Sequence, residues 1–452
     1  MARHNDTIAA LATPAGTAAL ATIRISGKDT NAIAGAVFRA APPPRVATHL
    51  DYVDARGAFV DDVVATLYAG PASYTGEDSL EISCHGSPFI ARKIVADLLA
   101  RGCRPAAPGE FTQRAFLNGR MDLSQAEAVM EVISARSDRA LEAAQRVLRG
   151  ALGRHMGRLV DGVVAMLATV EAYIDFPDED LPPENRALLE TGVSDVLLET
   201  ERLLATERTG ALLREGIATV IVGEPNAGKS SLLNRIVGHE RAIVSAEPGT
   251  TRDFIEERFN AGPHGLRLID TAGLNPGAGG AERLGIQKTI ERAEAADLFI
   301  LVLDSTRAAP PIPAEIARRM NKSNTIVALN KSDLLGGGTP EATPLPGLPF
   351  VRVSALSGEG IEELLSGLER LAEGMQTTVG DEQIAINVRH AHYLEEARAC
   401  LREALAKIRS HGPAELLASD LRGALGFLGE ISGKVDNERM LDQLFAAFCI
   451  GK

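Results

Sequence analysis

Apolar and polar positions follow different patterns in successive parts of this chain, and the changes between them divide it. In the N-terminal part, one helical pattern near Ile90–Arg101 accompanies short apolar runs of the strand type at Ile23–Ile25, Val63–Tyr68 and Leu80–Cys84. Short strands interspersed with a single helix predict an α+β domain. We place the end of this domain near residue 118.

Helical patterns begin at Ser124, where Ser124-Gln-Ala-Glu127 has the sequence of a capping box. Apolar residues then recur at helical spacing up to Ile174, and they resume toward Leu213 after the acidic, proline-containing segment Asp175–Pro183. The C-terminal part returns to helical patterns, over His392–Arg409, Glu415–Ile431 and Arg439–Phe448. Helices on both sides of a different middle segment predict one helical domain with another domain inserted into it.

The middle segment contains a phosphate-binding motif. The apolar run Ala218–Val222 leads directly into GEPNAGKSS, Gly223–Ser231, which matches G-x-x-x-x-G-K-[ST]. Backbone N–H groups of this loop are expected to surround the α- and β-phosphates of a nucleotide, and Lys229 to reach the β- and γ-oxygens. The Ser230 hydroxyl is expected to hold Mg²⁺. An ordinary glycine-rich turn is disfavoured because the motif and the preceding strand agree.

Later motifs identify the base and the γ-phosphate contact. In Asp270-Thr-Ala-Gly273, the Asp can bind Mg²⁺ through water while the Gly N–H meets the γ-phosphate. The carboxylate that ends Asn330-Lys-Ser-Asp333 can accept hydrogen bonds from N1–H and the 2-amino group of guanine, which adenine lacks. Ser354-Ala-Leu356 offers a backbone N–H to guanine O6. Together the motifs predict an α/β guanine-nucleotide domain whose substrate is GTP.

The residues that we expect to contact GTP come from these motifs and from the loop between the first two. They are Asn226, Ala227, Gly228, Lys229, Ser230, Ser231, Ser245, Thr250, Thr251, Asp270, Thr271, Ala272, Gly273, Asn330, Lys331, Asp333, Ser354, Ala355 and Leu356. In the loop Gly249–Asp253, Thr251 is the expected ligand of Mg²⁺ and the γ-phosphate, as in a GTPase switch. A simple polar turn is the weaker alternative.

Hydrolysis also needs a group that orients water. The position after DTAG is Leu274, whereas small Ras-like GTPases carry a Gln there. Asn226 can offer a side-chain oxygen to a monovalent cation beside the phosphates, and that cation would supply the charge of an arginine finger. Glu282 is the nearest carboxylate that a moving switch could bring to the water. A helix first-turn acid would look the same, so both interpretations of Glu282 stay open.

Composition excludes some classes of protein. The formal net charge of −13 over 452 residues argues against wholesale neutralisation of nucleic-acid phosphates, so any such contact must be local or shared with a partner. The four cysteines have no CxxC spacing, which predicts a reducing cytosol rather than a zinc site or a disulfide scaffold. Thr7–Ile23 is apolar enough for a signal peptide, but Pro14–Gly16 interrupts it. We expect a cytoplasmic protein without a membrane segment.

Several motifs outside the guanine-nucleotide part are highly specific. They are Ala12–Gly16, Ile23–Gly27, Tyr74–Asp78, Glu81–Gly86, Pro108–Glu127 and the terminal Phe448–Lys452. With a guanine-nucleotide domain in the middle, the chain closely resembles the MnmE (TrmE) family of tRNA modification GTPases. The resemblance covers essentially the whole chain.

The resemblance implies an activity and its partners. Members of this family act with a flavin-dependent partner, MnmG (GidA), which carries FAD, on the wobble uridine of certain tRNAs. The product is an aminomethyl or carboxymethylaminomethyl group at C5, with 5-formyl- or 5,10-methylene-tetrahydrofolate as the one-carbon donor. The resemblance also implies a homodimer whose GTPase domains pair in a K⁺-dependent manner and hydrolyse GTP faster as a result.

The resemblance assigns further roles residue by residue. Folate is expected at Arg24, Glu81, Arg120 and Lys452, although Arg120 stands where relatives often have Lys. K⁺ is expected at Asn226 and at the backbone of Ser245, Glu247 and Thr250. Cys449 matches a cysteine proposed to take part in the modification, and its ordinary alternative is a small buried hydrophobe.

The predicted fold is therefore multidomain, α+β and α/β. It comprises an N-terminal α+β domain for folate binding and dimerisation, a discontinuous helical domain and an inserted Ras-like P-loop GTPase domain, over 1–118, 119–213 with 376–452, and 214–375. Two rivals remain. One is a ribosome-assembly switch that binds RNA through a KH-type GxxG loop, whose spacing Gly426–Gly429 satisfies. The other is a folate-binding module whose GTPase only assembles the dimer.

Overall fold

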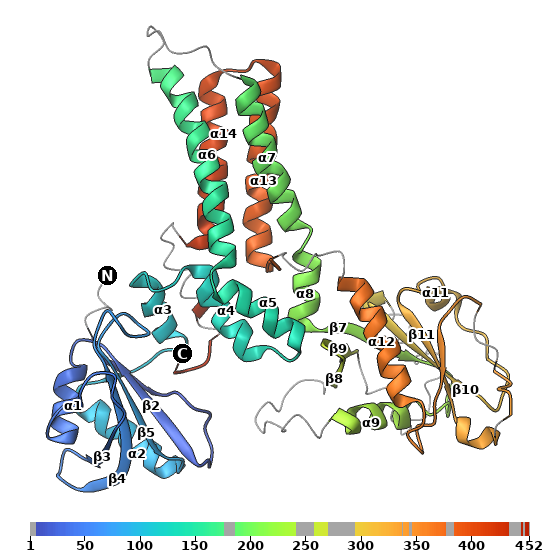
Figure 1. Cartoon of the computed structure of the whole chain (residues 1–452), viewed down its shortest axis with the longest axis horizontal. Helices are drawn as coiled ribbons and strands as arrows, with labels where there is room; N and C mark the ends of the chain where they lie inside the picture. The colour runs from blue at the N-terminus through green and yellow to red at the C-terminus, as the bar shows by residue number, and fades with distance from the viewer. Residues whose placement is uncertain are drawn as a thin grey trace, which may run out of the picture. The chain divides into compact units, whose positions relative to one another are not determined.

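Helices and strands of the computed structural model are drawn in Figure 1. The structure describes residues 6–175, 186–240, 257–269, 294–336, 338–342, 346–376, 384–433, 444–445 and 448–451. Internal contacts divide the chain into two units: 1–130 with 148–160 and 426–452, and 131–147 with 161–425. The division of the sequence into four segments stays a prediction.

The N-terminal part forms a mixed sheet, as predicted. Its strands are β1 (Ile8–Leu11), β2 (Leu20–Ser26), β3 (Thr48–Val53), β4 (Phe59–Tyr68), β5 (Ser79–His85) and β6 (Arg104–Pro105), in the order β3-β4-β5-β2-β1-β6. Neighbouring strands are antiparallel except β1 and β6. The three predicted strands are confirmed inside β2, β4 and β5, while β1 and β3 were not predicted.

Two helices cover one face of this sheet: α1 (Thr30–Phe38) and α2 (Pro88–Ala100). Helix α2 confirms the helix predicted near Ile90–Arg101, but the prediction of a single helix is wrong because α1 was missed. Their apolar residues share one core with alternate residues of the strands, including Ile23, Ile25 and Leu80. The alternation of buried and half-buried residues along β2 and β5 is what a sheet with one packed face requires. The apolar stretch weighed as a signal peptide contains β1 and the start of β2.

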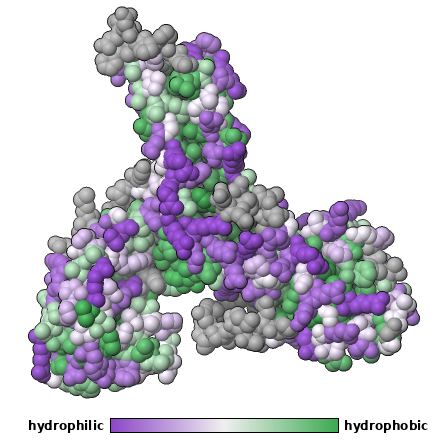
Figure 2. All heavy atoms as spheres, viewed as in Figure 1, coloured by the Kyte–Doolittle hydropathy of each residue, from purple (hydrophilic) through white to green (hydrophobic). Residues whose placement is uncertain are grey.

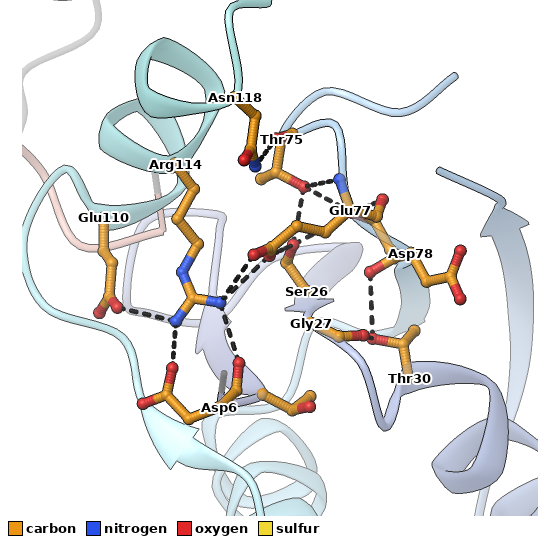
Figure 3. Close-up of polar contacts among 12 residues, drawn as sticks. Asp6, Ser26, Gly27, Thr30, Thr75, Glu77, Asp78, Glu110, Arg114 and Asn118 are labelled. Atoms are coloured by element: carbon orange, nitrogen blue, oxygen red, sulfur yellow. Dashed lines mark hydrogen bonds and ion pairs between the residues drawn. The ribbon is translucent and has the colours of Figure 1, made fainter. Parts of the chain in front are cut away.

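Buried charges fix the helix α3 (Glu110–Leu117) to this sheet, as Figure 3 shows. The guanidinium of Arg114, 2% exposed, lies 2.6 Å from Asp6, 3.1 Å from Glu77 and 3.1 Å from Glu110. Burial raises the pKa of Glu110, but hydrogen bonds from Arg104, the backbone of residue 107 and Arg114 outweigh it and lower the pKa. Each of the three carboxylates therefore has Arg114 as a cationic partner inside this part of the fold.

Long helices follow, in the two places that the sequence predicts. They are α4 (Leu123–Ser134), α5 (Asp138–Leu148), α6 (Ala151–Asp175), α7 (Arg186–Leu204), α8 (Glu207–Glu215), α13 (Val388–Ser410) and α14 (Ala414–Ser432). Helices α13 and α14 confirm two of the three predicted C-terminal helices. Most of the third, 439–448, lies outside the described residues. In the described part of the chain, no helix is both long enough and apolar enough to cross a bilayer.

The predicted capping box at Ser124–Glu127 is wrong by two residues. Asp122 Oδ1 accepts from the N–H of Gln125 at 2.8 Å, and Gln125 Oε1 accepts from the N–H of Asp122 at 3.0 Å. Ser124 instead donates its hydroxyl to Asp122 at 2.6 Å. Helix α4 therefore begins with the reciprocal pair Asp122–Gln125, because an Asp two residues earlier takes the capping position.

The inserted part is an α/β sheet. Its strands are β7 (Ile217–Val222), β8 (Arg258–Ala261), β9 (His264–Leu268), β10 (Leu298–Asp304), β11 (Thr325–Asn330) and β12 (Phe350–Arg352), in the order β12-β11-β10-β7-β9-β8. All neighbours are parallel except β8 and β9. An apolar core lies on each face of the sheet. One of the two cores includes residues of α9 (Lys229–Glu240) and α12 (Ile361–Gln376). This arrangement confirms the predicted fold class, and it brings the carboxyl ends of the parallel strands to one edge.

Candidate functional site

The phosphate-binding loop joins β7 to α9, as predicted, and its glycines are imposed by close packing. Gly223 has φ 158°, and a Cβ there would lie 2.3 Å from the carbonyl oxygen of Val302. Gly228 has φ 93°, and a Cβ there would lie 2.2 Å from Nδ2 of Asn330. Asn226 adopts φ 66° at the exposed tip of the loop. No side chain fits at the two glycines, so the loop backbone is held close to the sheet.

Lys229 begins α9 and turns back into the loop. Its ammonium group donates to the carbonyl oxygens of Gly223 at 2.9 Å and Glu224 at 2.7 Å. Burial lowers the pKa of Lys229. Ser230 and Ser231 follow in the first turn of α9, whose N–H groups point toward the loop. A helix N-terminus with an adjacent cation is suited to bind phosphate.

Asn330 connects this loop to the predicted guanine-binding segments. Its side chain is buried, and Nδ2 donates to the carbonyl oxygen of Ala227 at 2.8 Å. Its Oδ1 accepts from the N–H of Ala355 at 3.0 Å. The end of β11, the phosphate loop and the segment after β12 are therefore joined by one amide.

Lys331 and Asp333 follow Asn330 and differ in their surroundings. Lys331, with φ 64°, donates to Asp304 Oδ2 at 2.6 Å. Burial raises the pKa of Asp304, but hydrogen bonds from Lys331 and Thr306 outweigh it and lower the pKa to about 2. The side chain of Asp333 is exposed at the start of a short 3₁₀ helix, Ser332–Leu335. An exposed carboxylate beside a fixed loop is free to accept hydrogen bonds from a base.

The segment Ser354–Leu356 forms a tight turn after β12. The buried Ser354 accepts from the N–H of Ser357 at 3.1 Å through Oγ, and from the N–H of Gly358 at 2.8 Å through its carbonyl. Leu356 is 79% exposed. Hydrogen bonds within the turn therefore stabilise it, and the side chain of Leu356 is exposed to solvent.

Arg235 completes this site and was not predicted from the sequence. It lies on α9, and its guanidinium donates through Nε to the carbonyl oxygen of Ala355 at 3.1 Å and through Nη2 to that of Leu356. Both backbone groups of Ala355 are therefore hydrogen-bonded: its N–H donates to Asn330, and its carbonyl oxygen accepts from Arg235. No motif includes Arg235, and its only sequence signal is its position in the helix that follows the phosphate loop.

Several predicted site residues lie outside the described residues. They are Ser245, Glu247, Thr250, Thr251, Asp270, Thr271, Ala272, Gly273, Glu282 and Lys452. The roles assigned to them in switching, water orientation, cation binding and folate binding therefore stay predictions.

In the N-terminal part, two predicted folate residues lie together. Arg24 on β2 lies opposite Glu81 on β5, and Nη2 is 2.7 Å from Oε1. The same guanidinium lies 5.4 Å from the ring centre of Tyr74 and 5.6 Å from that of Phe111. It also donates to the carbonyl oxygen of Gly451 at 3.4 Å. A half-buried cation between two aromatic rings is suited to hold a flat, anionic molecule.

The other two described candidates lie on neighbouring loops. Carbons of the Arg120 side chain lie 3.3 and 3.5 Å from the position that a Cβ at Gly76 would occupy. Cys449 is exposed, and its carbonyl oxygen accepts from the N–H of Gly109 at 3.3 Å. The interpretation of Cys449 as a small buried hydrophobe is therefore wrong.

Comparison with known proteins gives a consistent picture over the full chain. A family model described as MnmE helical domain matches residues 123–449, and one described as GTP-binding protein TrmE N-terminus matches residues 7–120. The chain is 56% identical over 447 residues to a tRNA modification GTPase MnmE of Opitutus terrae, with 99% of each chain covered. It is 45% identical over 452 residues to the protein of the same name from Akkermansia muciniphila, again with 99% of each covered.

Removal of Arg235 tests the geometry of the turn at Ser354–Leu356, which is predicted to bind guanine. Arg235→Ala deletes both hydrogen bonds to the carbonyls of residues 355 and 356. Ordering of the turn then costs free energy at the moment when the nucleotide binds. We expect GDP affinity, measured by fluorescence titration, to fall about 10-fold, equivalent to about 1.4 kcal/mol. The kcat at saturating GTP should stay unchanged, and Arg235→Lys should recover only part of the affinity.

The matched control is Arg318→Ala, which removes an exposed arginine from the same sheet domain. Wild-type affinity in Arg235→Ala would contradict the role of this residue, as would an equal loss in the control.

Proposed function

The chain belongs to the MnmE family of tRNA modification GTPases, and we propose that it hydrolyses GTP to drive modification of a tRNA wobble uridine. The observation that carries the proposal is the convergence of three segments at one edge of the sheet. The phosphate loop, the Asn330–Asp333 motif and the turn at Ser354–Leu356 are joined by Asn330. This edge is where α/β proteins bind nucleotides.

At the phosphate end, each residue has a separate task. Lys229 moves from the carbonyls it now contacts to the β- and γ-phosphate oxygens, while loop N–H groups bind the remaining oxygens. Ser230 and Thr251 would hold Mg²⁺, with Asp270 acting through water. Bound Mg²⁺ neutralises charge that develops on the phosphates.

At the guanine end, hydrogen bonds determine specificity. The exposed carboxylate of Asp333 accepts from N1–H and the 2-amino group. The N–H of Ala355 is already donated to Asn330, so the N–H of Leu356 is the donor we assign to guanine O6. A base that lacks the matching groups leaves these polar atoms without hydrogen bonds, and the resulting loss of binding free energy disfavours that base.

K⁺ is proposed as the activating cation, with Asn226 as its side-chain ligand. Asn226 is exposed in a left-handed conformation, so its amide oxygen is available beside the phosphates. The backbone carbonyls of Ser245, Glu247 and Thr250 would complete the site, and K⁺ binding would pair the GTPase domains of a homodimer. Glu282 would orient the attacking water.

The one-carbon chemistry is assigned to the N-terminal part and a partner. Arg24, Arg120 and Lys452 would bind the carboxylates of 5-formyl- or 5,10-methylene-tetrahydrofolate, with Glu81 orienting Arg24. The flavoprotein MnmG would supply FAD, and the exposed Cys449 is accessible to the reacting groups. The tRNA substrates place the reaction in the cytoplasm.

The ribosome-assembly alternative loses its sequence support. Its GxxG signature, Gly426–Gly429, lies inside the helix α14. A KH loop must leave a helix to clamp a nucleic-acid backbone. The residues of this signature are therefore helical and form no loop.

Nucleoside mass spectrometry tests the activity directly. In cells that lack this protein, the aminomethyl-type wobble uridines should disappear from tRNA and should return with the wild-type chain. Lys229→Ala should fail to restore them, because the phosphate loop loses its cation. Lys322→Ala, an exposed control, should restore them fully. Unchanged wobble uridines in the deletion strain would exclude the proposed activity.

Cation dependence tests the role of Asn226. GTP turnover should be roughly 10-fold or more faster in K⁺ than in Na⁺ at equal ionic strength, because a cation in this position stabilises the transition state. Asn226→Ala should abolish the difference, and Asn234→Ala, exposed on α9, should retain it. Equal rates of the wild type in the two salts would rule out the cation site.

Folate binding tests the assignment of Arg24. The full-length chain should bind 5-formyl-tetrahydrofolate in calorimetry, and Arg24→Ala should weaken the affinity about 10- to 100-fold, as expected for a lost charge-assisted contact. Arg92→Ala, on the exposed surface of α2, serves as the control. If the wild type binds no folate, this part of the proposal fails while the GTPase assignment stands.

A further inference from the structure

An electropositive segment stands out in this acidic chain. Residues 146–158, RVLRGALGRHMGR, contain four arginines and one histidine but no aspartate or glutamate, whereas the whole chain has a formal net charge of −13. The proposed function does not use this segment.

The structure exposes three of its arginines. Arg149 lies between α5 and α6, and Arg154 and Arg158 lie one turn apart on α6. Arg154 donates through Nη1 to the carbonyl oxygen of Arg149 at 2.7 Å, and Arg158 donates through Nη2 to His155 Nδ1 at 3.0 Å. Figure 2 shows hydrophilic side chains over the N-terminal half of α6. We call Arg149, Arg154 and Arg158 the arginine triad.

The triad has no carboxylate partner among the described residues. Three exposed arginines on α13 and α14 do have one: Arg402 lies 2.6 Å from Glu201, Arg409 lies 2.7 Å from Glu190, and Arg422 lies 2.7 Å from Glu171. Asp122 packs against Gly153 and caps α4, so its carboxylate is already used.

The arrangement is locally unfavourable for the helix. Arg154 and Arg158 are like charges at i and i+4, which repel each other. Arg154 also lies in the first turn of α6, where the helix dipole disfavours a cation and no acidic residue compensates. An external anion bound to the triad would remove both penalties.

The side chains between the arginines indicate what kind of anion binds. They are Gly150, Ala151, Gly153 and Gly157, with Leu152 and Met156 buried. No large hydrophobic residue is exposed between 148 and 160. A protein partner is normally anchored by exposed aromatic or apolar residues, whereas a phosphate backbone needs cations on an unobstructed surface.

We propose that the arginine triad binds the phosphate backbone of the tRNA substrate. The proposal rests on the proposed function, which supplies the RNA, and adds the surface that contacts it. It also explains how a chain of net charge −13 approaches a polyanion, since the contact is confined to one short segment without acids.

The test is tRNA binding by the full-length chain over a series of salt concentrations. The variant Arg149→Gln/Arg154→Gln/Arg158→Gln should bind tRNA about 10-fold or more weakly at low salt. The slope of log affinity against log salt should become shallower by about 2, since each phosphate contact contributes about 0.7–0.9. GTP turnover should be unchanged, because none of the three residues belongs to the nucleotide site.

The control is Arg318→Gln/Arg319→Gln/Lys322→Gln, which removes the same charge from an exposed surface of the GTPase sheet domain. It should bind tRNA like the wild type. An unchanged affinity and slope in the triad variant would overturn the proposal, as would an equal loss in the control. Binding of the triad to anionic lipid vesicles, with no change in tRNA affinity, would overturn it too.

Two readouts separate this proposal from the proposed function. If the triad variant loses tRNA affinity while wobble uridines are normal in cells that lack the protein, the triad binds RNA but the modification activity is rejected. If the modification depends on Lys229 while the triad variant binds tRNA normally, only the triad proposal is rejected.

Discussion

The side-chain amide of Asn330 is the contact on which the nucleotide site depends. It joins the carbonyl of Ala227 to the N–H of Ala355. It also occupies the space where a Cβ at position 228 would lie, so only glycine fits there. Because Asn330 is buried, its loss would leave two backbone groups without partners, each costing about 1–3 kcal/mol. The phosphate motif and the guanine motif, about 100 residues apart, are thus one structural unit.

The sequence could predict that these three segments lie together because each follows the end of a strand. Motifs after β7, β11 and β12 must meet, since parallel strands bring their carboxyl ends to one edge of the sheet. Arg235 could not be predicted, because its contact depends on a turn that is 120 residues away in the chain and folds by its own hydrogen bonds. The capping box was misplaced because both Asp122 and Ser124 can cap a helix, and only the contact with Gln125 decides between them.

Two arginines of the N-terminal part differ in burial, and this difference decides which of them has a guanidinium that a ligand can contact. Arg114 is 2% exposed and fully enclosed by Asp6, Glu77 and Glu110, so it positions α3 and has no capacity left for a ligand. The side chain of Arg24 is 16% exposed; among the described residues it bonds to Glu81 and to the carbonyl of Gly451, and it lies beside two aromatic rings. The family resemblance selects Arg24 and not Arg114 for folate, and the fold gives a physical difference between them: only Arg24 keeps a partly exposed guanidinium.

The GTPase sheet is also bonded to the helix that precedes the arginine triad in the chain. Strands β8 and β9 lie in the chain between the two segments predicted to respond to the γ-phosphate, and residues of this hairpin also form contacts outside the sheet. The carbonyl of Pro263 accepts from the N–H of Arg139 on α5 at 3.2 Å, and Glu373 lies 2.8 Å from His264 and 3.2 Å from Arg139. The β8–β9 hairpin and the first turn of α5 are therefore joined both by a backbone hydrogen bond and through the carboxylate of Glu373.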